Sequence, residues 1–107
     1  MERKAASVPP FLLEDMMTPL FEMGRLVATP AAIAFCDEHL ISMISLVRRH
    51  LRGDWGDLTD HDEKLNEEAV KARETRIFSA YEFSQGRIWV ITEADRSFTT
   101  VLLPDDY

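Results

Sequence analysis

Residues 76–103 read RIFSAYEFSQGRIWVITEADRSFTTVLL, and this stretch decides the fold of the chain. Apolar and polar side chains alternate in its first part, and its later parts are rich in β-branched and aromatic residues, which is typical of strands. Ser84-Gln85-Gly86 supplies a hairpin turn, and Pro104 ends the last strand. We expect strands at 76–83, 87–93 and 98–103. Because their connections are short, these strands form an antiparallel meander.

Three helices are expected before the meander. Thr29, Ser42 and Thr59 are good helix N-caps, and a proline follows Thr29 at the position that helices favour. We expect helices over 30–38, 43–52 and 60–72. A short extended segment at 24–28 could add a fourth strand. The fold class is therefore α+β: three helices followed by an antiparallel three-stranded meander, with the helices packed on one face of the sheet.

The buried faces of the helices are expected to follow the spacing of their apolar residues. Cys36 falls at a core position of the first helix, which predicts a buried thiol. The expected buried faces are Ile44, Val47 and Leu51 on the second helix and Leu65, Ala69 and Ala72 on the third.

Composition narrows the class of protein. The chain has 107 residues, and its 46% hydrophobic content is sufficient for a folded core. Its 12 Lys and Arg against 19 Asp and Glu give a net charge of −7, which disfavours a broad phosphate-binding face, and one cysteine excludes an intrachain disulfide framework. No apolar run reaches the length of a membrane span or a signal-peptide core. We expect a cytoplasmic protein with a loosely attached leader at 1–18 and a single α+β domain at 19–107.

Three stretches of the chain are distinctive: Gly53-Asp54-Trp55-Gly56, Ile91-Thr92-Glu93-Ala94-Asp95-Arg96-Ser97, and Thr99-Thr100-Val101-Leu102-Leu103-Pro104. Together they resemble a family of small proteins carried on bacterial plasmids and integrative elements. Members of that family are labelled plasmid-related or hypothetical proteins, and some are labelled type I restriction subunits. The resemblance covers residues 20–107. It implies a mobile-element setting and brings neither an activity nor catalytic residues.

The densest polar cluster surrounds the start of the third helix. Histidines and carboxylates together suit a divalent metal or acid–base chemistry, but their spacing here matches no metal motif. We expect the carboxylates to cap the helix and shape the preceding turn, with no metal or cofactor bound. His50, at the end of the second helix, is expected to gain from the helix dipole. The members of the cluster are His50, Asp54, Asp57, Asp60, His61 and Asp62.

Trp55 lies on a glycine-containing loop and has two interpretations. It is either a plug of the hydrophobic core or an anchor for a partner, and we favour the plug. The nearby basic group of Arg48, Arg49 and Arg52 either touches a phosphate or complements the helix end and the acidic third helix. We favour the second interpretation.

The polar turn between the last two strands is a second candidate site. Glu93, Asp95 and Arg96 are expected to form a charge network that holds the turn. Thr99 and Thr100 place one hydroxyl on each face of the last strand, because side chains alternate along a strand. We expect at least one of these hydroxyls to be buried and hydrogen-bonded.

These features support two functional hypotheses. The preferred one is a non-enzymatic interaction or regulatory protein of a bacterial mobile element, with anti-defence action as one version. Its partner would be a host or mobile-element protein rather than nucleic acid or membrane. The alternative is a small ribonuclease-like or other hydrolytic enzyme, which would use His50, Asp54 and Arg96 for catalysis. The expected binding residues are Trp55, Asp57, Glu63, Glu67, Glu93, Asp95 and Arg96.

Overall fold

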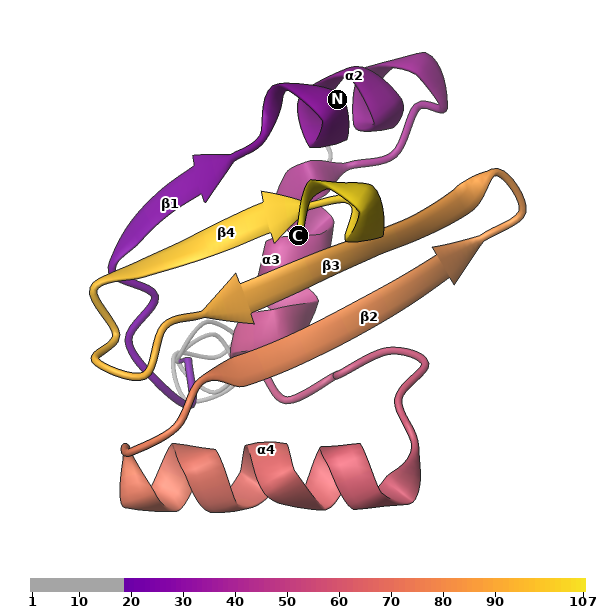
Figure 1. The fold of residues 1–107 in the computed structure, drawn as a ribbon. Helices are drawn as coiled ribbons and strands as arrows, with labels where there is room; N and C mark the ends of the chain where they lie inside the picture. The colour runs from indigo at the N-terminus through magenta and orange to yellow at the C-terminus, as the bar shows by residue number, and fades with distance from the viewer. Residues whose placement is uncertain (1–18) are drawn as a thin grey trace, which may run out of the picture.

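The structure is a computed structural model that describes residues 19–107, and the expected leader at 1–18 lies outside the described residues. Every expected helix and strand is present, and the helices and meander strands begin and end within one residue of the expected positions. Figure 1 shows the sheet with α3 behind it, α2 above it and α4 below it. Among the described residues no single helix is long and apolar enough to cross a membrane, and α2 with α3 meets that test only as a pair bent by 112°. The elements in chain order are β1 (Arg25–Ala28), α2 (Pro30–Glu38), α3 (Met43–Leu51), α4 (Asp60–Ala72), β2 (Ile77–Phe83), β3 (Gly86–Thr92), β4 (Phe98–Leu102) and a 3-10 turn, η1 (Pro104–Asp106).

The four strands form one sheet in the order β1-β4-β3-β2. β2, β3 and β4 are antiparallel neighbours, which confirms the meander. β1 joins as the fourth strand but runs parallel to β4, so the sheet is mixed rather than purely antiparallel. A parallel pair needs a long crossover connection, and the helices together with β2 and β3 provide it here.

The helices begin at the capping residues that the sequence indicates. The hydroxyl oxygens of Thr29, Ser42 and Thr59 each accept a hydrogen bond from a backbone N–H of the first turn, at 3.1, 3.2 and 3.1 Å. Pro30 is the first residue of α2. Gly53 follows the end of α3 with a φ of 86°, the left-handed conformation that glycine adopts most easily.

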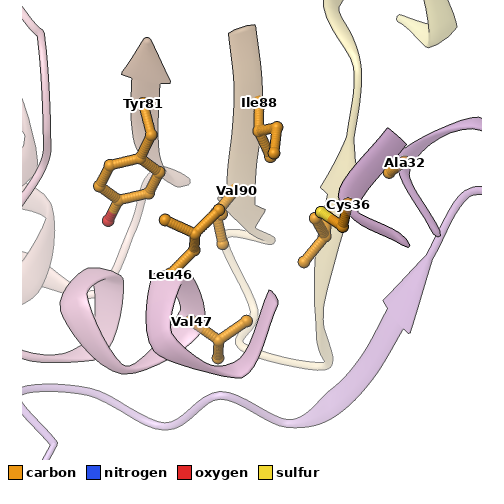
Figure 2. Close-up of a cluster of buried hydrophobic side chains, with 8 residues drawn as sticks. Ala32, Cys36, Leu46, Val47, Tyr81, Ile88 and Val90 are labelled. Carbon is orange, nitrogen blue, oxygen red and sulfur yellow. The ribbon is translucent and has the colours of Figure 1, made fainter. Parts of the chain in front are cut away.

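The main hydrophobic core lies between the sheet and the helices α2 and α3, on what we call the covered face of the sheet. Figure 2 shows side chains of α3 and of the strands pointing toward one another across this core. The thiol of Cys36 lies in it, as expected, and burial raises its pKa. A smaller cluster of Phe21, Trp55, Ala69 and Ile77 joins α4 to the same face. The main core consists of Ala32, Cys36, Leu46, Val47, Tyr81, Ile88, Val90 and Val101.

The buried face of α3 differs from the expected one. Leu46, Val47 and His50 are buried, whereas Ile44 is 52% exposed and Leu51 is only partly buried. His50 belongs to the buried face because the sheet offers it hydrogen-bonding partners. A pattern of apolar residues alone could not include it. The expected face is confirmed at Val47 and in part at Leu51, which packs against both clusters, and it was wrong at Ile44.

α4 lies along the edge strand β2 rather than over the covered face, so its expected position was wrong. Ala69 is buried as expected, but Leu65 is 49% exposed and Ala72 is exposed. Besides the apolar contact of Ala69 with Ile77, the contact with the sheet is polar. The side-chain amide of Asn66 donates to the carbonyl of Phe78 at 2.6 Å and accepts from its N–H at 3.1 Å. Asn66 thus takes the place of a neighbouring strand.

The edge loop, residues 53–57, closes a further part of the β2 edge. The carbonyl of Trp55 accepts from the N–H of Ala80 at 3.1 Å, and the Ala80 carbonyl accepts from the N–H of Asp57 at 2.7 Å. Gly56 lies between these bonds with a φ of 78°, and a Cβ there would meet the Ala80 oxygen at 2.2 Å. Only glycine therefore fits. The loop and α4 together occupy an edge to which another chain could otherwise pair.

The opposite face of the sheet is covered by no α-helix within the described residues, and we call it the open face. In Figure 1, η1 lies in front of this face. Tyr107, just after η1, packs against it through a ring contact with Trp89, whose ring centre is 5.8 Å away. The strands are therefore apolar on both faces. On the open face Ala80, Ile91 and Leu102 are buried, whereas Phe98 is 39% exposed. The apolar residues of the open face are Phe78, Ala80, Trp89, Ile91, Phe98 and Leu102.

Candidate functional site

His50 is the centre of a buried polar network. Its Nδ1 lies 2.6 Å from the Ser79 hydroxyl, and its Nε2 lies 2.9 Å from the Thr92 hydroxyl. The Thr92 oxygen is 2.6 Å from that of Thr99, which donates to the carbonyl of Met23 at 2.8 Å. All four side chains of the network are fully buried. The expectation that one threonine hydroxyl of the last strand is buried and hydrogen-bonded is confirmed at Thr99.

The carbonyl of Met23 sets the direction of these hydrogen bonds. A carbonyl only accepts, so Thr99 uses its proton there and accepts from Thr92. Thr92 then accepts from Nε2–H of His50, and the unprotonated Nδ1 accepts from Ser79. His50 is a neutral ring with both nitrogens satisfied, and burial lowers its pKa to about 3. Stabilisation by the helix dipole needs a charged ring, so the expectation that the dipole stabilises His50 was wrong.

The buried neutral His50 predicts a loss of stability in mild acid. The unfolded chain binds a proton near pH 6.5 and the folded chain only near pH 3, so protonation favours unfolding across that interval. The free energy of unfolding should fall by about 1.4 kcal/mol for each pH unit below 6.5, or about 2 kcal/mol at pH 5. Denaturant melts between pH 7 and 5 measure this slope. In His50→Gln, which does not titrate, the slope should be nearly flat, and an equally steep slope would rule out His50 as its source.

Asp54 holds Arg49 in place. Its carboxylate accepts from Nε and Nη2 of Arg49 at 2.7 and 3.2 Å, which lowers the pKa of Asp54 and raises that of Arg49. It also accepts from the N–H of Gly56 at 3.3 Å, so it shapes the turn as expected. The guanidinium of Arg49 lies over the Tyr81 ring, 4.5 Å from its centre, and the Tyr81 hydroxyl donates to the Asp54 carbonyl at 2.7 Å. Asp54 is thus part of a structural unit.

The remaining members of the polar cluster around the start of α4 do not lie together. Asp57 accepts from the N–H of Glu82 at 2.8 Å, so it caps the β2 edge instead of α4. Asp60 and Asp62 lie in the first turn of α4, as expected, and His61 is exposed beside them. Within residues 19–107, no three histidine, cysteine or carboxylate side chains are close enough to share a metal ion.

Arg96 is 6% exposed and bonds to backbone carbonyls instead of to the carboxylates of its turn. The expected charge network with Glu93 and Asp95 was therefore wrong. Asp95 instead accepts from the N–H of Ser97 at 2.9 Å, which holds the turn locally. A buried guanidinium needs several acceptors, and the chain supplies them from three segments. They are the carbonyl oxygens of Ala69, Thr75, Glu93 and Ala94, at 2.8, 2.8, 3.1 and 3.0 Å.

The expected site residues do not share one accessible surface. Trp55 is only 5% exposed, which confirms it as a core plug. Of the catalytic candidates, His50 and Arg96 are buried with their hydrogen bonds directed into the fold, and the Asp54 carboxylate is engaged by Arg49. Among the acidic binding candidates, Glu67 and Asp95 are exposed on different elements, and Glu63 and Glu93 are half-buried.

The concave surface that the structure does show is a groove of about 620 Å³ between α4 and the start of β2. Leu65 and Phe78 give it an apolar lining, and Arg76 also lines it. Three carboxylates also line it, from α4 and from the segment after it. They are Asp62, Glu68 and Glu74.

The groove continues onto the open face of the sheet. The ring of Phe78, which lines the groove, meets the ring of Trp89 edge-on at 5.1 Å. Trp89 in turn meets Tyr107, over which Arg76 of the groove lies at 5.4 Å. The indole N–H of Trp89 has no hydrogen-bond acceptor within the described residues. We call the groove and these aromatic rings the groove surface.

The groove surface is not among the expected sites, although the sequence carries one signal of it. Both alternating sets of β3 are apolar, with Ile88 and Val90 in one and Trp89 and Ile91 in the other. Such a strand indicates a sheet with two apolar faces. The position of α4 along the edge, which creates the groove, depends on the contact of Asn66 and has no signal in the apolar pattern.

Comparison of the chain with protein-family models, with curated proteins and with solved structures gives no match. These comparisons assign no family and no activity to the chain. The features of the chain that bear on its function are therefore the geometry of the groove surface and the charges around it.

Proposed function

We propose that this chain is a small, acidic, non-enzymatic interaction or regulatory protein of a bacterial mobile genetic element, acting in the cytoplasm. The observation that carries the proposal is the groove surface: an apolar groove that continues onto a sheet face without a helix to cover it. Leu65 is 49% exposed and Tyr107 is 71% exposed on this surface. Exposed apolar side chains beside a groove are a feature of binding sites. The resemblance of the sequence motifs to mobile-element proteins supports the setting.

The chemistry of the groove surface favours a partner segment that is both apolar and basic. α4 carries five carboxylates and two lysines, and three carboxylates line the groove. Leu65 and Phe78 offer apolar contacts for an inserted side chain. Opposite charges around an apolar centre steer the encounter and fix its orientation.

The hydrolytic alternative has less support from the geometry. It requires His50, Asp54 and Arg96 to meet around a substrate, and two of these side chains are buried with their hydrogen bonds directed into the fold. A general base must reach the proton that it removes. The interaction hypothesis needs only the surface that is present, so we favour it.

The substitution Leu65→Arg should weaken partner binding without unfolding the chain. Leu65 is half exposed on a helix, and arginine is a good helix former, so the stability should change little. The new positive charge would fill the apolar groove and repel a basic partner. The affinity for the partner, once captured from a bacterium that carries the gene, should fall at least tenfold. Titration of the purified pair measures this loss.

The matched control is Ile44→Arg, which places the same charge at an equally exposed apolar position on α3. It should leave the affinity unchanged. The anti-defence version further predicts that expression of the wild-type chain protects incoming unmodified DNA from restriction, and that Leu65→Arg removes this protection. Equal affinities of the two variants would show that the partner binds elsewhere.

A further inference from the structure

A second concave surface lies on the far side of the molecule from the open face, on the solvent side of α3. It is a hollow of about 420 Å³ lined by Ser45, Arg48, Arg49, Arg52 and Asp54. Residues 45, 48, 49 and 52 follow the three- and four-residue spacing that places side chains on one face of a helix. We call this surface the arginine hollow.

The charge of the arginine hollow is positive in an otherwise acidic chain. Its single carboxylate, Asp54, is already engaged by Arg49 through two hydrogen bonds. Arg48 and Arg52 are exposed and form no ion pair with a carboxylate within the described residues. The expectation that this basic group complements the acidic helix α4 therefore finds no contact in the structure. Two positive charges are left for a ligand.

Arg49 is fixed in advance of any ligand. The Asp54 carboxylate holds two of its nitrogens, and the Tyr81 ring lies against its guanidinium. A guanidinium in a set position loses little side-chain freedom when a ligand binds, and this favours affinity. The hydroxyl of Ser45 adds a further hydrogen-bond donor to the same hollow.

We propose that the arginine hollow binds a phosphate group of a small phosphorylated ligand. Guanidinium groups match the oxygens of phosphate with paired, charge-assisted hydrogen bonds. The hollow offers the guanidinium groups of Arg48 and Arg52, the remaining N–H groups of Arg49 and a hydroxyl around one concavity, which suits a group with three or more oxygens. A long polyanion is disfavoured because the chain as a whole carries a net charge of −7. The proposal is independent of the groove surface, which lies on α4 and the opposite face of the sheet.

Titration of the full chain with inorganic pyrophosphate, followed by amide NMR shifts, tests this site. Saturable shifts should be confined to residues around 45–54. The double variant R48Q/R52Q should weaken binding at least tenfold, and it leaves the unit of Arg49, Asp54 and Tyr81 intact, so the fold is retained. The control R25Q/R73Q removes the same charge from exposed positions on other elements and should bind as the wild type does.

Three results would overturn the proposal. One is the absence of saturable pyrophosphate binding, which would leave the arginines as complements of the helix end. Another is equal weakening in both double variants, which would show an effect of overall charge. The third comes from a parallel titration with a short oligothymidylate: tighter binding than pyrophosphate would assign the hollow to nucleic acid instead of a small ligand.

Discussion

Replacement of Trp55 by alanine is expected to lower the free energy of unfolding by about 3–5 kcal/mol, the range for truncation of a large buried aromatic residue. Trp55 is 5% exposed and stacks on Phe21 with ring centres 6.2 Å apart. It also meets the ring of His50 at 6.0 Å. Its removal would open a cavity between α4 and the sheet and would admit water to the buried network. A loss of this size is a large share of the stability of a small domain.

Denaturant melts followed by circular dichroism measure this effect, since the substitution alters tryptophan fluorescence. Trp55→Phe keeps an aromatic ring in the cluster and should lose clearly less stability than Trp55→Ala. Trp89→Ala is a second comparison, because Trp89 is the other tryptophan and is half-buried on the open face. It should destabilise the chain less while affecting partner binding more. An unchanged melting midpoint for Trp55→Ala would contradict the role of Trp55 as a core plug.

The existence and order of the elements could be predicted from the sequence because their signals are local. Thr29, Ser42 and Thr59 mark helix starts through hydrogen bonds within one turn. The alternation in residues 76–103 marks strands whose neighbours follow directly in the chain. The direction of β1 depends on pairing with a strand some seventy residues later, and a local pattern carries no information about that pairing.

The sites were harder to predict because a polar residue can be either an accessible functional group or a buried, hydrogen-bonded part of the fold. The position of His50 at a helix end predicts an accessible or dipole-stabilised group, yet His50 lies on the buried face with Leu46 and Val47. Ser79, Thr92 and Thr99 all occupy positions of the strands that face the core. Their shared face is the sequence signal that indicates a buried hydrogen-bond network. A polar residue in a pattern of buried positions is itself an indication of buried hydrogen bonding.

The edge loop shows why a distinctive motif need not be a binding site. Four residues of the loop all stabilise the fold. Asp54 holds Arg49, and Trp55 fills the core. Gly56 allows the backbone to approach the β2 edge, and Asp57 accepts a hydrogen bond from that edge. An uncapped edge strand would invite pairing with other chains. The specificity of the motif therefore reflects close backbone approach, and the accessible chemistry lies elsewhere, in the groove surface and the arginine hollow.

Replacement of Arg96 by alanine is the second substitution with a large expected effect. Its guanidinium donates to carbonyls of α4, of the segment after α4 and of the turn between β3 and β4, so it joins three parts of the chain. Each hydrogen bond from a charged group contributes about 1.5–3 kcal/mol, and buried carbonyls left without a donor add a penalty. The four bonds share one side chain and are not additive, so we expect a loss of about 3 kcal/mol or more.

The effect of Arg96→Ala should also be local, which distinguishes it from Trp55→Ala. The Ala69 carbonyl belongs to the last turns of α4, where a positive charge is favoured by the helix dipole. Without Arg96, α4 should separate from the sheet first, and hydrogen exchange should accelerate in α4 before it does in β3. Arg73→Ala is the matched control, since Arg73 is exposed and only 3.4 Å from an exposed Glu22, and its loss should stay within about 0.5 kcal/mol. Because lysine offers one compact charge instead of a planar fork, Arg96→Lys should recover only part of the stability. Full recovery by lysine would show that charge alone, and not the set of carbonyl bonds, explains why an arginine is buried at this turn.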